Sequence, residues 1–297
     1  MRNAGRLMAP GFLLPPWLHP VRRDGYSRPM NDLLAPDEAL AYEIVNPASE
    51  GRVLLVCDHA SHAVPRALDG LGLDPIELLR HIGWDIGAAD VTRRLAAALD
   101  APAVLGGYSR LVIDCNRDLD HPGLILAESD RTPVPGNAEL AEAERRARIA
   151  GIHAPFHAAI EGEIARLRAT TGPEASPVIL SIHSFTPIMD EIERPWQIGI
   201  LWNRDARIPE PLIARLRRDG DLTVGDNEPY SARFGYGYTL ERHGDGIGLA
   251  NALVEIRQDL IDTPRGVEQW SDRLLAALED VLPRPELYRQ EESVHGG

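Results

Sequence analysis

The segment VLLVCDHASHAVP, residues 53–65, ends an apolar run with an acid and two histidines. His59 follows this run directly, and His183 follows the second apolar run VILSI in the same way. Asp85 lies in the sequence HIGWDIG, where a helix is expected to begin. Two imidazoles and one carboxylate form a three-ligand set typical of catalytic zinc, which keeps a fourth position for water. The sequence therefore predicts a site for one Zn²⁺ per chain at these three residues.

Other residues compete for the same metal. On a strand, Asp58 would face away from His59, so it is expected to orient a ligand or cap the strand rather than bind metal. His62 has an H-x-x-H spacing with His59 and remains an alternative ligand. His153 and His157 share one helix face, but a proline lies between them, so they are interpreted as structural or pocket-lining residues.

A hydrolytic metal site also needs a group that takes a proton from water. Glu255 is the candidate, because it is a carboxylate within the apolar segment NALVEIRQDL. Burial there would raise its pKa towards neutrality. The alternative interpretation is a salt bridge between Glu255 and Arg257 or another basic residue.

The segment GGYSRLVIDCNRD, residues 106–118, contains two arginines suited to an anionic substrate. Arg110 and Arg117 have planar guanidinium groups that suit bidentate binding of a carboxylate. Asn116 would add an amide donor, and Arg110 is also a candidate donor to the carbonyl under attack. The alternative is structural pairing of the arginines with nearby aspartates, namely Asp114, Asp118 and Asp120.

The glycine-rich segment GYGYTLERHGDGIG precedes Glu255 and contributes two further candidates for substrate binding. Tyr238 and His243 could close over a bound substrate from this segment. Equally, the segment could be only a turn-rich connection.

Short apolar runs alternate with amphipathic segments from about residue 50, which predicts an α/β fold. We expect a mostly parallel mixed sheet flanked by helices in an α/β/α sandwich, with ligands gathered at the carboxyl ends of the strands. Extended segments are predicted at 53–57, 101–107, 110–117, 177–185, 197–203 and around 252–256. Helices are predicted at 85–100, 138–169, 209–220 and 267–282, the second with a break or kink at Gly151 and Pro155.

The composition is that of a globular protein, with 44% hydrophobic and 26% charged residues among 297. The net charge of −14 argues against a nucleic-acid surface. No apolar run approaches the roughly 20 residues of a membrane span. Two cysteines, Cys57 and Cys115, are interpreted as buried thiols in a reducing compartment, and the expected location is cytoplasmic.

The expected organisation has three parts. Residues 1–38 are predicted to be a flexible N-terminal extension in which Met30 is an alternative translation start. Residues 39–283 are predicted to form a single α/β hydrolytic domain, and residues 284–297 a polar C-terminal tail.

Five motifs occur in order between about residues 50 and 283: CDHASHAVP, GWDIGAADV, YSRLVIDCNRD, SIHSFTP and ALVEIRQDL. Together they resemble the N-formylglutamate amidohydrolase family. The family is similar in fold to zinc carboxypeptidases and zinc cell-wall amidases, so the resemblance implies an α/β/α sheet with zinc at the strand ends. The first motif reads DHAS where better-known members tend to read PHSG, and the acidic ligand is Asp rather than the Glu of the carboxypeptidases.

The resemblance also implies residue functions and a reaction. His59, Asp85 and His183 match the zinc ligands, Glu255 the general base, and Asn116 with its neighbour Arg117 the pair that holds a substrate carboxylate. The implied reaction converts N-formyl-L-glutamate, or a similar N-acyl acidic amino acid, to formate and the amino acid.

Two alternatives remain open at this point. One is a zinc amidase acting on another N-acyl amino acid or a cell-wall peptide, and the other is a non-catalytic binding protein of the same fold. The expected partner is a small anionic N-acyl amino acid, with no nucleic acid or membrane, and the chain is expected to be a monomer or a small homo-oligomer.

Overall fold

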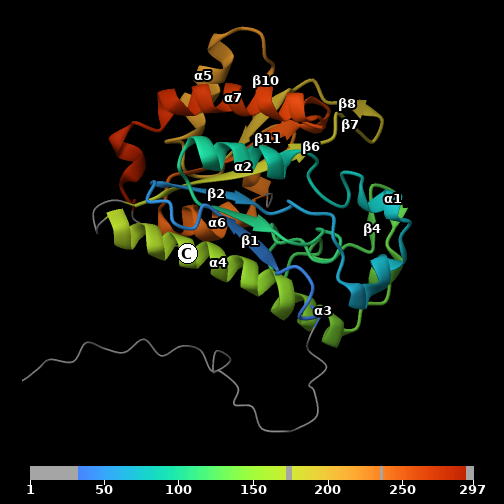
Figure 1. Ribbon diagram of the computed structural model, residues 1–297. Coiled ribbons are helices and arrows are strands. Elements are labelled where there is room, and N and C mark those ends of the chain that lie inside the picture. Colours follow the sequence, from blue (N-terminus) through green and yellow to red (C-terminus); the bar gives the residue numbers. More distant parts are fainter. Residues whose placement is uncertain (1–32, 172–175, 235–236, 292–297) are drawn as a thin grey trace, which may run out of the picture. The chain divides into compact units, whose positions relative to one another are not determined.

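A seven-stranded mixed sheet is the framework of the fold (Figure 1). The computed structural model describes residues 33–171, 176–234 and 237–291. In sheet order the strands are β1 (Tyr42–Val45), β3 (Ala103–Gly106), β2 (Val53–Cys57), β6 (Val178–Phe185), β11 (Asn251–Arg257), β9 (Ile198–Leu201) and β10 (Val224–Asp226). β3, β2, β6 and β11 run parallel, whereas β1 and β9 are antiparallel to β3 and β11. This arrangement confirms the predicted α/β class with a mostly parallel mixed sheet.

Helices cover both faces of the sheet. One face carries α2 (Ala88–Ala98), α5 (Pro209–Arg218) and α7 (Pro264–Val281), and the other carries α4 (Ala154–Thr171) and α6 (Tyr238–His243). Successive side chains of β6 point to opposite faces of the sheet, so this strand contributes to the apolar core on both faces. Leu180 and Ile182 join the apolar core beneath α2 and α7, and Ile179 joins the core beneath α4. Because strand side chains alternate, His183 shares the face of Ile179.

The predicted helix over 138–169 is irregular at the expected place. It consists of α3 (Glu142–Arg148), a π-helical turn at Ile149–His153 and α4. Pro155 has no N–H to donate to the preceding turn, which contains Gly151, and the wider turn accommodates this loss. The predicted break in this helix is therefore a π-helical turn between α3 and α4, without an interruption of the helix.

Residues 110–117 were predicted to be extended, and this prediction is wrong. The segment forms turns, in which the Val112 N–H donates to Ser109 O at 2.9 Å and the Asn116 N–H donates to Asp114 Oδ1 at 2.9 Å. These local bonds occupy backbone N–H groups that would otherwise be available for hydrogen bonds to a neighbouring strand.

The sequence patterns do not predict β1, β10 or α6, and they do not predict two short hairpins and one further short helix. The hairpins and this further helix are β4 (Glu128–Ser129) with β5 (Thr132–Pro133), β7 (Ile188–Met189) with β8 (Ile192–Glu193), and α1 (Pro75–Leu78). Both hairpin tips place two residues at positive φ, Asp130 with Arg131 and Asp190 with Glu191. Tight hairpin turns are usually recognised in a sequence by Asn-Gly or Asp-Gly. Neither of these two pairs contains glycine, so the sequence gives no such signal.

The packed region extends beyond the predicted domain limits at both ends. Leu33 is buried in the core near α4, and Leu287 is fully buried in a 3-10 turn at Pro285–Tyr288. Apolar side chains outside residues 39–283 therefore also pack on the domain. Residues 1–32, with Met30, and 292–297 lie outside the described residues. Within the described part, no helix combines the length and apolarity that a membrane span needs.

Candidate metal centre

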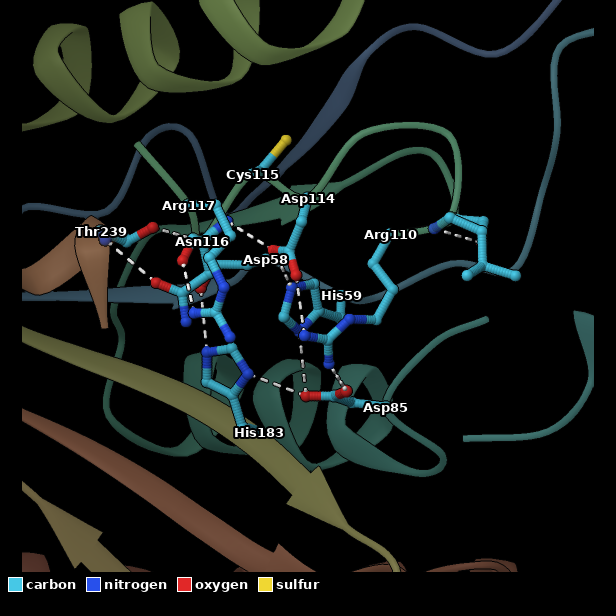
Figure 2. Close-up of polar contacts among 12 residues, drawn as sticks. Asp58, His59, Asp85, Arg110, Asp114, Cys115, Asn116, Arg117, His183 and Thr239 are labelled. Carbon is cyan, nitrogen blue, oxygen red and sulfur yellow. Dashed lines mark hydrogen bonds and ion pairs between the residues drawn. The ribbon is translucent and has the colours of Figure 1, made fainter. Parts of the chain in front are cut away.

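The structure brings the three predicted metal ligands together. His59 follows β2, His183 lies in the neighbouring strand β6, and Asp85 precedes α2 (Figure 2). Each offers one ligand atom within 4.8 Å of the other two, and all three residues are buried. Adjacent parallel strands that end at the same edge bring the two histidines to one place, as the strand pattern predicted.

One oxygen of Asp85 is the meeting point of the three side chains. Asp85 Oδ2 lies 2.8 Å from His183 Nδ1 and 3.4 Å from His59 Nδ1. The Asp85 N–H donates to His59 O at 2.9 Å, and the Ser184 N–H lies 3.3 Å from Asp85 Oδ2. The backbone therefore holds the carboxylate against both rings, with the two Nδ1 atoms turned inwards.

The outer nitrogen of each ring contacts a further carboxylate. His59 Nε2 lies 2.7 Å from Asp114 Oδ1, and His183 Nε2 lies 3.0 Å from Asp58 Oδ2. A carboxylate behind a metal-binding imidazole fixes the tautomer and the ring orientation, so that the other nitrogen presents its lone pair. The predicted orienting function of Asp58 agrees with this contact, and Thr239 Oγ1 in turn donates to Asp58.

The charge of this cluster suits a divalent cation. Three carboxylates, those of Asp58, Asp85 and Asp114, surround the two rings, and Arg110 supplies one positive charge. With neutral imidazoles, three negative charges and one positive charge leave a net charge of minus two. These carboxylates also change the pKa of His183. Burial alone would lower it, but the hydrogen bonds to Asp58 and Asp85 raise the pKa of His183 well above its usual value. Two imidazoles and a carboxylate with this surplus charge fit zinc.

Glu255 is the unpartnered carboxyl group of the site. It is 6% exposed, and its Oε2 has no hydrogen-bond partner among the described residues. Burial, followed by repulsion from Asp85, raises the pKa of Glu255 to about 7, even though His183 acts in the opposite direction. The alternative ion pair with Arg257 is not formed, because Arg257 Nε donates to Asp259 at 2.8 Å.

A cavity of about 310 Å³ opens onto these groups. Its wall includes the three candidate ligands and Glu255, together with Arg110, Asn116 and Arg117. Ser129 on β4 and Met189 on β7 also line it, so the two short hairpins contribute to its outer part. The volume is at the lower end of the range for small-molecule sites, about 300–1,000 Å³.

The two arginines differ in their surroundings. Arg110 donates to Asp114 Oδ2 at 2.7 Å and lies 3.6 Å from Asp85 Oδ1, so the alternative of structural pairing is found there. It nevertheless lines the cavity. Arg117 donates to Asn116 O at 3.0 Å, and Asn116 Oδ1 accepts from the Thr239 N–H at 3.1 Å.

Tyr238 and His243 were predicted to bind substrate, and the structure places them elsewhere. As far as the described residues define the cavity, neither side chain lines it. His243 is 2% exposed, with its Nε2 2.8 Å from His157 Nδ1, and the Tyr238 ring packs against His157. The reason is that this side of α6 faces α4, whereas Thr239 faces Asp58.

The remaining predictions for this region are settled by contacts. The His62 ring packs against Trp84, with centroids 5.2 Å apart, and His62 is not part of the three-residue cluster. Cys57 and Cys115 are free and buried, as predicted. The sequence indicates Asp114 only as a possible ion-pair partner of an arginine. The signal that could have identified it is a lone carboxylate within the apolar run LVIDC.

Comparisons with known proteins give one matching family and several similar solved structures. Residues 51–262 match the family model described as N-formylglutamate amidohydrolase. A solved gene product of Agrobacterium tumefaciens, Atu2144, is 35% identical with a TM-score of 0.78, over 84% of this chain and 99% of that chain. The N-formylglutamate amidohydrolase of Ralstonia eutropha JMP134 is 19% identical with a TM-score of 0.59, over 82% of this chain and 98% of that chain. At this identity the second similarity shows the fold alone. A search of curated proteins gives no match.

Proposed function

The chain belongs to the N-formylglutamate amidohydrolase family, and from this premise we propose that it is a zinc-dependent amidohydrolase. Its proposed substrate is N-formyl-L-glutamate or a similar N-acyl acidic amino acid. The observation that carries the proposal is the convergence of His59, Asp85 and His183 on one point beside the unpartnered carboxyl group of Glu255.

His59 Nδ1, His183 Nδ1 and the carboxylate of Asp85 are the groups that would hold the metal. A zinc ion there would polarise a substrate carbonyl and acidify water. Asp58 and Asp114 lie behind the rings at Nε2, so that each Nδ1 would be available to a bound metal.

Glu255 is the proposed general base. Burial raises its pKa to about 7, so that near neutral pH it can both accept and release a proton. It takes a proton from the water that adds to the formyl carbon. As the C–N bond breaks, it returns this proton to the leaving amine, and the products are formate and the free amino acid.

Arg117 and Asn116 are the proposed anchor for a substrate carboxylate, supported by their position in the cavity wall. A guanidinium group binds a carboxylate through two parallel hydrogen bonds, which fixes the substrate in orientation as well as in place. Arg110 is fixed by Asp114 and would direct its remaining N–H groups at the carbonyl oxygen. These cations would attract an anionic substrate to a chain with a net charge of −14.

The test is metal analysis of the purified full chain, followed by formate release from N-formyl-L-glutamate. The proposal predicts close to one zinc per chain, formate release, loss of activity with a chelator and recovery when zinc is added back. N-acetyl-L-glutamate and a cell-wall peptide serve as parallel substrates. Zinc without formate release, but with hydrolysis of another amide, would replace the substrate and keep the class. A chain that binds no divalent metal would contradict the proposal.

A further inference from the structure

Three histidines form a buried cluster behind the metal centre, between α4 and α6. His153 and His157 are 2% and 0% exposed, and His243 is 2% exposed. The rings of His157 and His243 stack with centroids 5.1 Å apart, and those of His153 and His157 lie 4.4 Å apart. None of the three lines the cavity described above, so the proposed reaction leaves the cluster without a function.

The hydrogen-bond partners determine where the protons of this cluster lie. His157 Nε2 is 3.0 Å from Cys115 O, and a carbonyl only accepts, so this nitrogen donates. In a neutral ring the other nitrogen then accepts, and His243 Nε2 donates to His157 Nδ1 at 2.8 Å. His153 Nε2 likewise donates to Arg117 O at 3.0 Å.

Burial supports the neutral form. It lowers the pKa of His157 to about 2 and that of His243 to about 3, and it also lowers the pKa of His153. The same contacts argue against a second metal site, because His153 Nε2 and His157 Nε2 carry protons that they donate to backbone carbonyl groups. The cluster is therefore a fixed set of neutral donors.

Both carbonyls that accept these bonds belong to one turn, residues 114–117. The Asp114 carboxylate holds His59 Nε2 at 2.7 Å and receives the Asn116 N–H at 2.9 Å. The Arg117 side chain lines the cavity. Any shift of this turn would therefore move the ring of a metal ligand and a proposed substrate anchor at the same time.

We propose that His157 is a positioning residue for the metal centre: its bond to Cys115 O fixes the turn 114–117, and with it the Asp114 carboxylate that orients His59. His243 holds the ring of His157 in the donating tautomer, and His153 secures the end of the turn at Arg117. The link to metal binding rests on the proposed function, whereas the link between His157 and the turn does not.

Two substitutions of His157 separate the hydrogen bond from the bulk of the ring. His157→Phe keeps a ring of similar shape and removes the donor, while His157→Gln places an amide N–H near the position of Nε2. Deuterium uptake of peptides covering residues 110–118 is measured on the metal-free full chain. We expect faster uptake in the Phe variant and uptake close to wild type in the Gln variant.

Zinc affinity is the second measurement, made by competition with a chromophoric chelator. We expect His157→Phe to weaken zinc binding about tenfold, the lower end of the range for losing a direct partner of a ligand. His157→Gln should restore most of the affinity. Ile160→Val, a buried substitution on the same helix α4, is the control for general loss of packing and should change neither measurement.

The outcomes are distinct. Unchanged uptake and affinity in the Phe variant, or equal changes in Ile160→Val, would overturn the proposal. Failure of Gln to restore either quantity would also overturn it, since the donor would then be irrelevant. If the wild-type chain binds no zinc, the proposed function fails, while deuterium uptake still decides whether His157 fixes the turn. If His157→Phe does not fold, His157→Asn, which keeps the acceptor for His243 but lacks the donor to Cys115, replaces it.

Discussion

Glu255 lies directly opposite His183 in the parallel ladder between β11 and β6. Partners in such a ladder point to the same face of the sheet, and neighbouring strands are held about 4.8 Å apart. The sheet itself therefore carries the proposed base to the side of a proposed ligand, without help from a loop. The burial that raises the pKa of Glu255 follows from its place inside the sheet.

Glu255→Gln should retain zinc and lose roughly 10²-fold or more in kcat, the scale of general-base loss, because an amide cannot accept the proton of water. Metal content and initial rates of formate release measure the two effects. Asp259→Asn, which removes the ion-pair partner of Arg257 at the end of the same strand, is the matched control. An unchanged kcat in Glu255→Gln would remove this residue from the mechanism.

Arg117→Ala should mainly raise KM for dicarboxylate substrates, by roughly 10- to 100-fold, the scale of a lost hydrogen bond to a charged group. Steady-state kinetics with N-formyl-L-glutamate measures KM and kcat separately. Arg131→Ala is the control, because Arg131 is an exposed arginine that pairs with Asp190 on the other hairpin. A fall in kcat at constant KM would show that Arg117 does not anchor a carboxylate.

Asp58→Asn should weaken zinc binding by about 10- to 100-fold. The side chain that contacts His183 Nε2 then has no negative charge and fixes the tautomer of His183 less firmly. A chelator competition assay measures this change. Because Thr239 donates to Asp58, Thr239→Val should have a smaller effect in the same direction. Equal zinc affinity in Asp58→Asn and wild type would mean that His183 does not need this partner.

The metal-free chain should lose stability as the pH falls below about 6.5. The unfolded chain binds protons at His157 and His243 in that range, whereas burial lowers their native pKa to about 2 and about 3. Each contributes up to about 1.4 kcal/mol per pH unit to the free energy of unfolding, lost as the pH falls. Well below pH 6.5, His59 and His183, whose pKa values are raised, are protonated in both states and add little slope. The raised pKa of Glu255 offsets part of the loss, because the native state binds this proton at a higher pH than the unfolded state does.

The variant His157→Gln isolates the contribution of His157 to the pH dependence of the free energy of unfolding. Between pH 6 and 4.5 its free energy of unfolding should fall less steeply than that of wild type, since one buried neutral histidine is gone. Urea denaturation of both proteins at several pH values gives the two slopes. Equal slopes would show that His157 is not held neutral in the native state.

Much of the fold follows from local patterns. The apolar segments at 53–57, 177–185 and around 252–256 form β2, β6 and β11. Continuous runs of buried β-branched and aliphatic residues favour central parallel strands. The segment 110–117 has similar apolarity and formed turns instead, because the side chains of Ser109 and Asp114 bond to its backbone. Apolarity alone does not distinguish these two results.

The sequence by itself determined which residue types stand at the strand ends, and so it indicated His59, Asp85, His183 and Glu255. Only the tertiary structure decided which carboxylate lies behind each histidine, that Glu255 is free of Arg257, and that His243 faces His157 rather than the cavity. The physical reason is that periodicity fixes the face of a side chain within its own element. Contacts between distant elements depend on how strands and helices pack, which no local pattern encodes.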